Sequence, residues 1–406
     1  MQGVTLMQSD KPGSRRRHSR SAVTRAATLL GLLALAGCSL LPREPEPPPA
    51  PPPPPPPPPI LAPLATHSFE FDPETTGVIG ELQVTQSRHE DTLADIARRF
   101  NLGYEEVVNA NPGVDPWLPG DGTRIVLPTQ FVLPDAPHDG IVVNLAALRM
   151  FYFPKPGKDG RRVVMTYPIG IGKVGWATPS GKTTIVSKRK NPWWSPPLSV
   201  RKEHAAEGDP LPARVPPGPD NPLGNRAMNL GWPSYLIHGT NKPAGVGLRA
   251  SHGCIRMYPE DIEQLFDLAA LGTKVTVVNQ PLLYRWHGDS LYVQSYPPHE
   301  ELRSNNKEAQ AEQRHALFNK AISNEIWQRV RQQGGVVDWK VTEQVVNEAR
   351  GVAVPVSRRG ISYDGYLASA RRVENTLPEG ANWDGSDGED EPADKASGVG
   401  ARRTKP

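Results

Sequence analysis

The six residues Ser251-His252-Gly253-Cys254-Ile255-Arg256 are the most informative part of this chain, because they contain an isolated cysteine between a histidine and an arginine. The 406 residues include two cysteines, and the other one, Cys38, ends an N-terminal targeting sequence. An exported protein with one remaining thiol cannot form an internal disulfide. Such a thiol is also open to oxidation. Cys254 is therefore predicted to be a nucleophile.

A cysteine nucleophile needs a base near its sulfur and hydrogen-bond donors for the oxyanion. A free cysteine has a pKa of about 8.5, so the neutral thiol predominates near pH 7 without a partner. We assign the base to His238, which a separate segment brings to Cys254. The neighbouring His252 is expected to orient the loop, because only residues i and i+2 of a strand share a face.

Other residues around this pair have expected supporting roles. The carbonyl of Gly239 is expected to accept from the far ring nitrogen of His238 and fix its tautomer. The amides of Gly253 and Cys254 are candidates for the oxyanion hole. Arg256 is expected to hold either a substrate carboxylate or the loop itself.

Three alternatives compete with this interpretation. His238, His252 and Cys254 could ligate zinc, although they lack the close ligand pairs of usual zinc sites. Cys254 could be an inert buried residue, but its polar neighbours are poor core residues. The glycine pattern of residues 170–175 resembles a dinucleotide-binding loop, yet Thr178-Pro179 follows where a helix should open. A β-turn is the better prediction for these glycines.

The N-terminal segment is predicted to export and anchor the chain. Several arginines precede an apolar run from Ala26 to Leu35, which is too short to span a bilayer. Residues 35–38, Leu-Ala-Gly-Cys, resemble a bacterial lipobox, which implies that residues 1–38 are a lipoprotein signal peptide ending at lipidated Cys38. By the same resemblance, Ser39 implies a periplasmic protein anchored to the outer membrane. Residues 39–66 form a proline-rich linker, expected to be extended polyproline II.

The rest of the chain is predicted to contain a small module, a larger domain and an extension. Residues 81–128 have the pattern of a β-α-α-β unit, with Asp91 as the expected cap of the first helix. Residues 140–281 predict a mostly β domain, sandwich- or barrel-like, with one clear helix after Pro259. Residues 282–375 predict a hairpin around Gly288-Asp289 and helices over 305–331 and 337–350. Residues 376–406 predict a disordered tail.

Two resemblances add to these patterns. Residues 81–128 resemble a LysM module, a type of domain that binds N-acetylglucosamine-containing glycans. Residues 238–240 and 251–256, with Asn191-Pro192-Trp193-Trp194, residues 218–224 and Thr178-Pro179-Ser180-Gly181, resemble the YkuD-type catalytic domain of L,D-transpeptidases. The second resemblance covers about residues 140–280.

The L,D-transpeptidase resemblance implies a peptidoglycan stem tetrapeptide as substrate. Cys254 would attack the carbonyl of the third residue, usually meso-diaminopimelate, and release D-alanine. An amine of a second stem would then take the acyl group in a 3→3 cross-link, or a lipoprotein lysine would take it. The implied catalytic residues are Cys254 and His238, and the implied substrate-binding or oxyanion residues are Gly239, Thr240, Ser251, His252, Gly253 and Arg256. No cofactor and no metal are needed, because the thioester conserves the bond energy.

Two further functions remain open at this stage. Water as acceptor would make the protein an L,D-carboxypeptidase. A non-catalytic envelope anchor could hold glycan strands through residues 81–128. Nucleic acid is not an expected partner, because 46 basic residues against 43 acidic ones leave a net charge of only +3.

Overall fold

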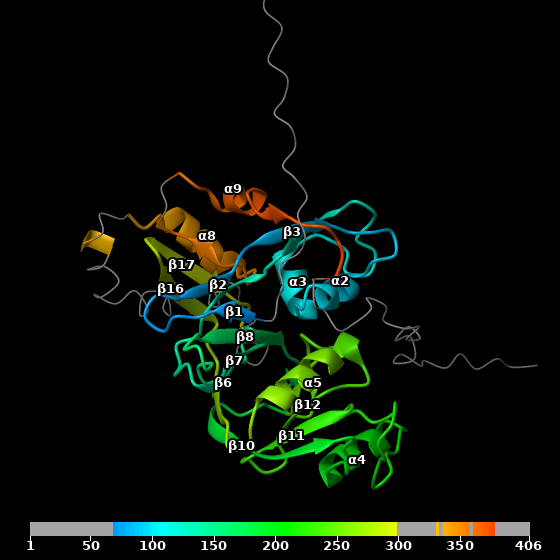
Figure 1. The fold of residues 1–406 in the computed structure, drawn as a ribbon. Coiled ribbons are helices and arrows are strands. Elements are labelled where there is room, and N and C mark those ends of the chain that lie inside the picture. The colour runs from blue at the N-terminus through cyan, green and yellow to red at the C-terminus, as the bar shows by residue number, and fades with distance from the viewer. Residues whose placement is uncertain (1–67, 299–329, 333–335, 358–359, 378–406) are drawn as a thin grey trace, which may run out of the picture. The chain divides into compact units, whose positions relative to one another are not determined.

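The computed structural model describes residues 68–298, 330–332, 336–357 and 360–377, and Figure 1 shows them as a ribbon. The predicted signal peptide with Cys38, the linker over 39–66, most of the helix over 305–331 and nearly all of the tail lie outside the described residues. Among the described residues, no helix combines the length and the apolar character needed to cross a bilayer.

The predicted mostly β domain is present as one curled sheet of nine strands. In spatial order the strands are β1 (Ser68–Glu70), β8 (Val163–Pro168), β7 (Arg149–Phe153), β6 (Gly140–Asn144), β15 (Lys274–Val278), β10 (Gly181–Lys190), β11 (Arg226–Leu230), β12 (Leu236–His238) and β14 (Ile255–Arg256). The pairs β6–β15 and β12–β14 are parallel, and the other neighbours are antiparallel. A register shift between Ile185 and Ser187 in β10 accommodates the curl.

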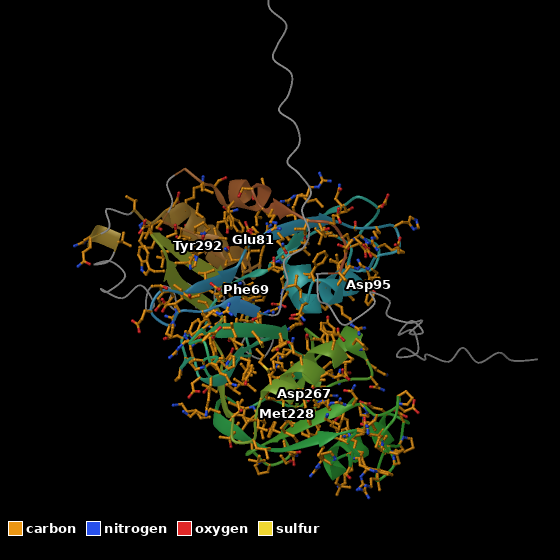
Figure 2. The ribbon with its side chains drawn as sticks, in the orientation of Figure 1. Phe69, Glu81, Asp95, Met228, Asp267 and Tyr292 are labelled. Carbon is orange, nitrogen blue, oxygen red and sulfur yellow. The ribbon has the colours of Figure 1, made fainter. Side chains whose placement is uncertain are left out.

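Helix α5 (Pro259–Leu268) covers the part of the sheet that ends at β12 and β14. It begins at the expected Pro259, whose missing N–H costs nothing at the first helical position. Its inner face is Ile262, Leu265 and Phe266, which pack in one core with Met228 of β11. Figure 2 labels Met228 on β11 and Asp267 on α5. The helix packs on β11, and β11 pairs with β12, the strand that carries His238.

Residues 83–127 form the predicted β-α-α-β order. The elements are β3 (Gln83–Gln86), α2 (Leu93–Arg99), α3 (Tyr104–Ala110) and β4 (Arg124–Leu127), with β3 and β4 antiparallel. Leu93, Ile96 and Phe100 are completely buried beneath the two short helices. The apolar spacing of the sequence therefore matches the packed face of α2.

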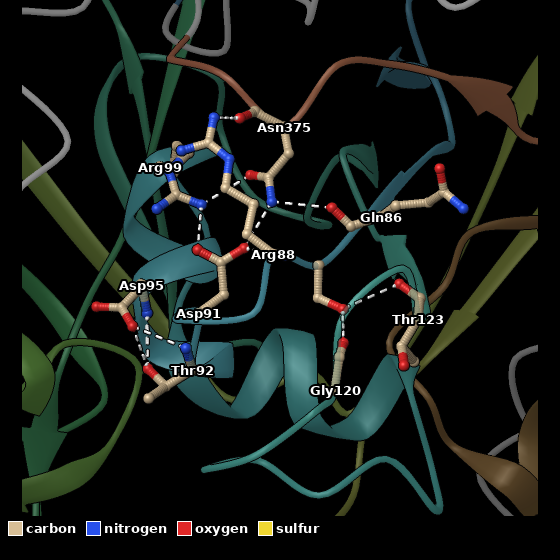
Figure 3. Close-up of polar contacts among 10 residues, drawn as sticks. Gln86, Arg88, Asp91, Thr92, Asp95, Arg99, Gly120, Thr123 and Asn375 are labelled. Atoms are coloured by element: carbon tan, nitrogen blue, oxygen red, sulfur yellow. Dashed lines mark hydrogen bonds and ion pairs between the residues drawn. The ribbon is translucent and has the colours of Figure 1, made fainter.

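The expectation that Asp91 caps α2 is wrong. Thr92 is the cap: its Oγ1 accepts from the Asp95 amide at 3.2 Å, and the Asp95 carboxylate accepts from the Thr92 amide at 2.8 Å (Figure 3). Asp91 instead accepts from the Arg88 amide at 2.7 Å and pairs with Arg99 Nη1 at 2.9 Å. The Asp91 carboxylate therefore connects the segment before α2 with Arg99 at the C-terminal end of the helix.

A late segment of the chain completes the β-α-α-β unit. Strand β19 (Arg371–Arg372) pairs in parallel with β3 and gives the sheet a third strand. The side chain of Asn375 then donates to the Gln86 carbonyl at 2.9 Å and to Asp91 at 2.7 Å, and it accepts from Arg99 at 2.7 Å (Figure 3). Residues near 375 are thus a structural part of this unit.

The remaining elements are small sheets and three helices. A three-stranded antiparallel sheet contains β16 (Leu282–His287), β17 (Ser290–Ser295) and β18 (Val354–Pro355), and α8 (Trp339–Glu348) packs on it through Val341 and Val345. The hairpin turn lies at Gly288, as the sequence indicates, and α8 lies within the segment predicted to be helical over 337–350. Strands β18 and β19 of the extension were not predicted. The other elements are β2 (Val78–Gly80) paired with β5 (Gln130–Val132), β9 (Ile171–Gly172) paired with β13 (Arg249–Ser251), α4 (Leu198–Ala206), a 3-10 turn at Pro243–Gly245 and α9 (Tyr363–Ala368).

A buried ion pair joins the β-α-α-β unit to the nine-stranded sheet. The Arg149 side chain of β7 is completely buried, and its Nε and Nη2 both lie 2.7 Å from the Glu106 carboxylate of α3. Arg149 also donates to the Asn101 carbonyl at 3.0 Å and lies 4.1 Å from the centre of the Phe131 ring. A charge buried this completely is tolerated only when it is paired and hydrogen-bonded.

We predict that Glu106→Ala lowers the free energy of unfolding by roughly 3–5 kcal/mol, because it leaves the Arg149 guanidinium buried without its partner. The matched control is Asp159→Ala, which breaks an arginine–carboxylate pair whose side chains are 77% and 50% exposed and should cost at most about 1 kcal/mol. Urea unfolding followed by circular dichroism measures both changes. Equal losses in the two variants would contradict the structural role of the buried pair.

Candidate active site

The parallel pairing of β12 with β14 places the candidate nucleophile and base on one face. His238 lies opposite Arg256, and Ile237 lies opposite Ile255. The register therefore places Cys254 level with Leu236. Because side chains alternate along a strand, Cys254, Arg256 and His238 share one face, while the two isoleucines enter the core. Two segments that are 16 residues apart thus meet as the sequence predicts.

His238 is buried and held in one tautomer. Its Nδ1 lies 2.6 Å from the Gly239 carbonyl, the partner expected from the sequence. A carbonyl only accepts, so Nδ1 carries the proton and Nε2 is left as the acceptor. Burial, together with the positive charge of Arg256, lowers the pKa of His238 to about 3. The imidazole is therefore neutral near pH 7 and able to take a proton at Nε2.

Cys254 is half-buried and holds its proton. Its Sγ donates a long hydrogen bond of 3.6 Å to the Ser234 carbonyl. Burial raises the pKa of the thiol, although the Leu236 backbone and the charge of Arg256 act in the opposite direction. No hydrogen bond among the described residues joins this sulfur to His238. Cys254 and His238 are therefore a neutral thiol and a neutral imidazole in this structure, rather than an ion pair.

The loop before Cys254 is held by two hydroxyl groups. Ser251 Oγ donates to the Cys254 carbonyl at 2.6 Å and accepts from the Gly253 amide at 3.2 Å. Thr178 Oγ1 donates to the Gly253 carbonyl at 2.9 Å and accepts from the Gly172 amide at 3.1 Å. The Gly253 amide is thus already engaged, which leaves the amide of Cys254 as the better oxyanion donor of the two that we considered.

Gly253 is required by its conformation and its surroundings. Its φ of +100° lies in the region that favours glycine, and an added Cβ would lie 3.0 Å from Cε1 of Tyr235. Gly172 is equally restricted, because a Cβ there would lie 1.7 Å from the Trp176 carbonyl oxygen. The glycines of residues 170–175 therefore allow close packing beneath the Cys254 loop, and residues 173–176 form the expected turn.

His252 faces away from the pair and toward α4. Its Nε2 lies 3.1 Å from the Glu203 carboxylate, and its ring meets Trp176 edge to face at 4.9 Å between centroids. Glu203 also pairs with Lys173 Nζ at 2.5 Å. These contacts agree with the expectation that His252 orients the loop rather than serving as the base.

Arg256 and Thr240 differ in their hydrogen bonds. The Nε of Arg256 is buried without a hydrogen-bond partner among the described residues, and burial lowers the pKa of its guanidinium. The guanidinium is thus a largely desolvated charge on the strand face that Cys254 and His238 share. The hydroxyl of Thr240, by contrast, is used in a turn, where it accepts from the Lys242 amide at 2.9 Å and donates to its carbonyl at 3.2 Å.

Sequence reasoning missed two residues that shape this site. Thr178 belongs to a four-residue motif and counts against a dinucleotide-binding loop, but the sequence assigns it no contact with the Cys254 loop, and it assigns no role to Glu203. Thr178 precedes a proline, and Glu203 lies on a helix that was not predicted. Their partners, Gly253 and His252, are distant in the sequence, so residue spacing does not indicate these contacts. The described residues contain no group of three or more histidines, cysteines and carboxylates arranged to hold a metal ion.

Comparisons with known proteins agree on one family. Residues 138–277 match the model of the L,D-transpeptidase catalytic domain, YkuD. The chain is 42% identical over 225 residues to the probable L,D-transpeptidase YcfS of Escherichia coli K12, which covers 54% of this chain and 69% of that protein. It is equally identical, over 225 residues, to the probable L,D-transpeptidase YbiS of the same strain, which covers 54% of this chain and 72% of that protein.

Solved structures give a weaker comparison. The NMR structure of the catalytic domain from the E. faecium L,D-transpeptidase is 26% identical and covers 36% of this chain and 100% of that chain, with a TM-score of 0.27. The chain belongs with the relatives above through its sequence.

We predict that His238 makes the stability of the protein fall in acid. Its pKa is 6.5 when exposed and about 3 when folded, so between these values the unfolded chain binds more protons. The free energy of unfolding should therefore decrease as the pH falls from 6.5 toward 3, by at most ~1.4 kcal/mol per pH unit from this residue.

The test is urea unfolding of the wild type and of His238→Gln between pH 7 and pH 4. The variant should lose this part of the slope, whereas His287→Gln, at an exposed strand position, should keep it. Parallel pH dependences in the wild type and in His238→Gln would show that the folded state does not keep this imidazole neutral.

Proposed function

Since the chain belongs to the L,D-transpeptidase family with a YkuD catalytic domain, we propose that it transfers an acyl group between peptidoglycan peptides through a thioester on Cys254. Members of this family act on peptidoglycan. The observation that best supports the cysteine mechanism is the shared face of β12 and β14, where a neutral His238 with a free Nε2 lies beside the thiol.

The proposed first half-reaction begins with proton transfer. Cys254 turns from the Ser234 carbonyl, its Sγ attacks the carbonyl of the third stem residue, and its proton passes to Nε2 of His238. The Cys254 amide donates to the oxyanion. When the intermediate collapses, the C–N bond breaks and the D-alanine nitrogen takes the proton from His238. Each group then returns to its charge before the attack, and the acyl group remains on sulfur.

The second half-reaction reverses these proton transfers. A neutral amine attacks the thioester carbonyl and gives a proton to Nε2 of His238, and the departing Cys254 sulfur recovers that proton. The Nδ1 bond to the Gly239 carbonyl persists throughout and stabilises the imidazolium that forms transiently. In this proposal Arg256 holds a carboxylate of the bound peptide, because its guanidinium lies on the strand face that carries Cys254 and His238.

The principal acceptor in this reaction is the amine of a second stem peptide, which gives a 3→3 cross-link. A lysine of a lipoprotein would give attachment of that lipoprotein to peptidoglycan, and water would give L,D-carboxypeptidase activity. All three use the same thioester, so the alternatives differ only in what reaches it. A non-catalytic glycan-binding anchor is the alternative without a thioester.

The proposed location is the periplasm, with lipidated Cys38 in the outer membrane and residues 39–66 as a spacer. In this proposal residues 81–128 act as a LysM-like module that binds glycan strands. Its support is the β-α-α-β order and the exposed Trp117, which lies 6.3 Å from the Tyr104 ring between centroids. An aromatic surface of this kind suits stacking against sugar rings.

We predict that Cys254→Ala loses both D-alanine release and dimer formation from tetrapeptide muropeptides, by at least about 10³-fold, because the covalent step requires the sulfur. Liquid chromatography with mass spectrometry measures both products. A carbapenem should also add covalently to the wild type and not to the variant.

Ser187→Ala is the control, since this hydroxyl contacts Asn229 at 3.0 Å on the strand pair β10–β11, and it should retain activity. Undiminished D-alanine release by Cys254→Ala would reject the nucleophile. Binding to sacculi by the wild type, without any product or adduct, would favour the non-catalytic anchor.

A further inference from the structure

Three of the four backbone hydrogen-bonding groups of Gly253 and Cys254 are held by side-chain hydroxyls. The Gly253 amide and the Cys254 carbonyl both contact Ser251 Oγ, at 3.2 and 2.6 Å. The Gly253 carbonyl contacts Thr178 Oγ1 at 2.9 Å. None of these bonds uses the Cys254 N–H, which is the group that the proposed mechanism needs for the oxyanion. The direction of this N–H therefore depends on how the neighbouring groups are held.

The Gly253 carbonyl and the Cys254 N–H belong to the same peptide unit. A peptide unit is planar, and in its trans form the C=O and N–H bonds point in opposite directions. A contact that fixes the carbonyl therefore also fixes the N–H, which points away from Thr178. Of the two hydroxyl groups that hold the loop, only that of Thr178 contacts this peptide unit, because Ser251 contacts the units before and after it.

The proton of the Thr178 hydroxyl has only one acceptor between its two partners. The Gly172 N–H lies 3.1 Å from Oγ1 and can only donate, so the hydroxyl accepts there. Its own proton is left for the Gly253 carbonyl, which can only accept. Thr178 is 7% exposed, so bulk water has little access to this chain of hydrogen bonds. Hydrogen bonds in such a chain polarise one another, which makes the Cys254 N–H a better donor.

Close packing keeps the hydroxyl at this peptide unit. Pro179 restricts the backbone of Thr178 to extended conformations. A Cβ added to Gly172 would lie 2.9 Å from the Gly253 Cα, so the two glycines bring β9 directly against the Cys254 loop. The Thr178 side chain therefore bonds both segments at the point where their backbones are in contact.

We propose that Thr178 is a positioning residue for the acyl transfer: its hydroxyl orients the peptide unit that presents the Cys254 N–H to the oxyanion. The inference rests on the proposed thioester mechanism and adds to it the residue that prepares the oxyanion donor. The N–H of the nucleophile itself is a recurrent oxyanion donor in acyl transfer. Such a donor is most effective when it is oriented before the charge develops. Thr178 acts through the peptide unit and needs no contact with the substrate.

Thr178→Val removes the hydroxyl and keeps the shape of the side chain. Loss of one oxyanion donor slows an acyl transfer by about 10²–10³-fold, and a misdirected donor should cost part of this. We therefore expect acylation of Cys254 by a carbapenem, followed by mass spectrometry, to slow at least about 10-fold. Thr178→Ser keeps the hydroxyl and should remain within about three-fold of the wild type.

A second reagent separates the orientation of the donor from a general loss of structure. Iodoacetamide alkylates the Cys254 sulfur by displacement at a saturated carbon, which forms no oxyanion, so its rate in Thr178→Val should stay within about two-fold of the wild type. With the tetrapeptide substrate, kcat should fall while KM stays within about two-fold, because the donor acts in the transition state.

Thr85→Val is the matched control. Thr85 Oγ1 also donates from a buried position to a backbone carbonyl, that of Val373 at 3.1 Å, but it lies in the β-α-α-β unit and does not contact the Cys254 loop. This variant should leave the rates of both reagents unchanged.

Equal carbapenem rates in Thr178→Val and the wild type would overturn the proposal. Equal slowing of the two reagents would also overturn it, as would a Thr178→Ser variant as slow as Thr178→Val. A wild type that iodoacetamide alkylates, but that neither a carbapenem nor the tetrapeptide acylates, would instead reject the proposed function.

The hydrogen bond itself can be measured without any reaction. In protein labelled with carbon-13 at glycine carbonyls and nitrogen-15 at cysteine, the Gly253–Cys254 peptide gives an NMR correlation that Cys254→Ala removes. Loss of a hydrogen bond moves a carbonyl carbon upfield, so this signal should move upfield in Thr178→Val and much less in Thr178→Ser. An unchanged signal in Thr178→Val would show that the hydroxyl does not hold this carbonyl, and it would overturn the proposal whatever the activity of the protein.

Discussion

The parallel pairing of β12 with β14 is the constraint on which the site depends. It sets His238 opposite Arg256 and leaves Cys254 on the same face, while Ile237 and Ile255 are buried in the core. A register change of one residue would exchange these faces and bury the sulfur among aliphatic side chains. The hydrophobic core therefore fixes the catalytic geometry, because the two isoleucines determine which side chains remain on the outer face.

Burial affects the ionisable side chains of this protein in two ways: it shifts the pKa values of the site residues, and it forces a buried charge to have a partner. At His238 it lowers the pKa and keeps the imidazole ready to accept a proton, and at Cys254 it raises the pKa and keeps the thiol protonated. At Arg149 burial instead requires a permanent partner, which Glu106 supplies from a different part of the chain. Desolvation therefore keeps the His238 imidazole available as a base for the protonated thiol, and at Arg149 it ties α3 to β7 through a charge pair.

Features that are set by residues close together in the sequence were predictable from the sequence. Four features were predictable in this way: the mostly β character of residues 140–281, the start of α5 at Pro259, a turn among the glycines of residues 170–175 and the Gly239 partner of His238. They follow from strand alternation, proline and glycine placement, and adjacency in the sequence. Partners brought together by the fold were not predictable in this way. Asp91 was expected to cap a helix because nothing nearby indicates Asn375, which lies 284 residues further along the chain. Glu203 and Thr178 reach the Cys254 loop through tertiary contacts that leave no spacing to recognise.

The proposed reaction requires a neutral His238, with its proton on Nδ1 and its Nε2 available to the Cys254 thiol. Nitrogen-15 NMR of histidine-labelled protein measures this state directly, with His238→Gln used to assign the signal. The account predicts a protonated Nδ1 and an unprotonated Nε2 for His238 at pH 7, unchanged down to pH 5. A doubly protonated ring at pH 6, or a proton on Nε2 in place of Nδ1, would contradict it.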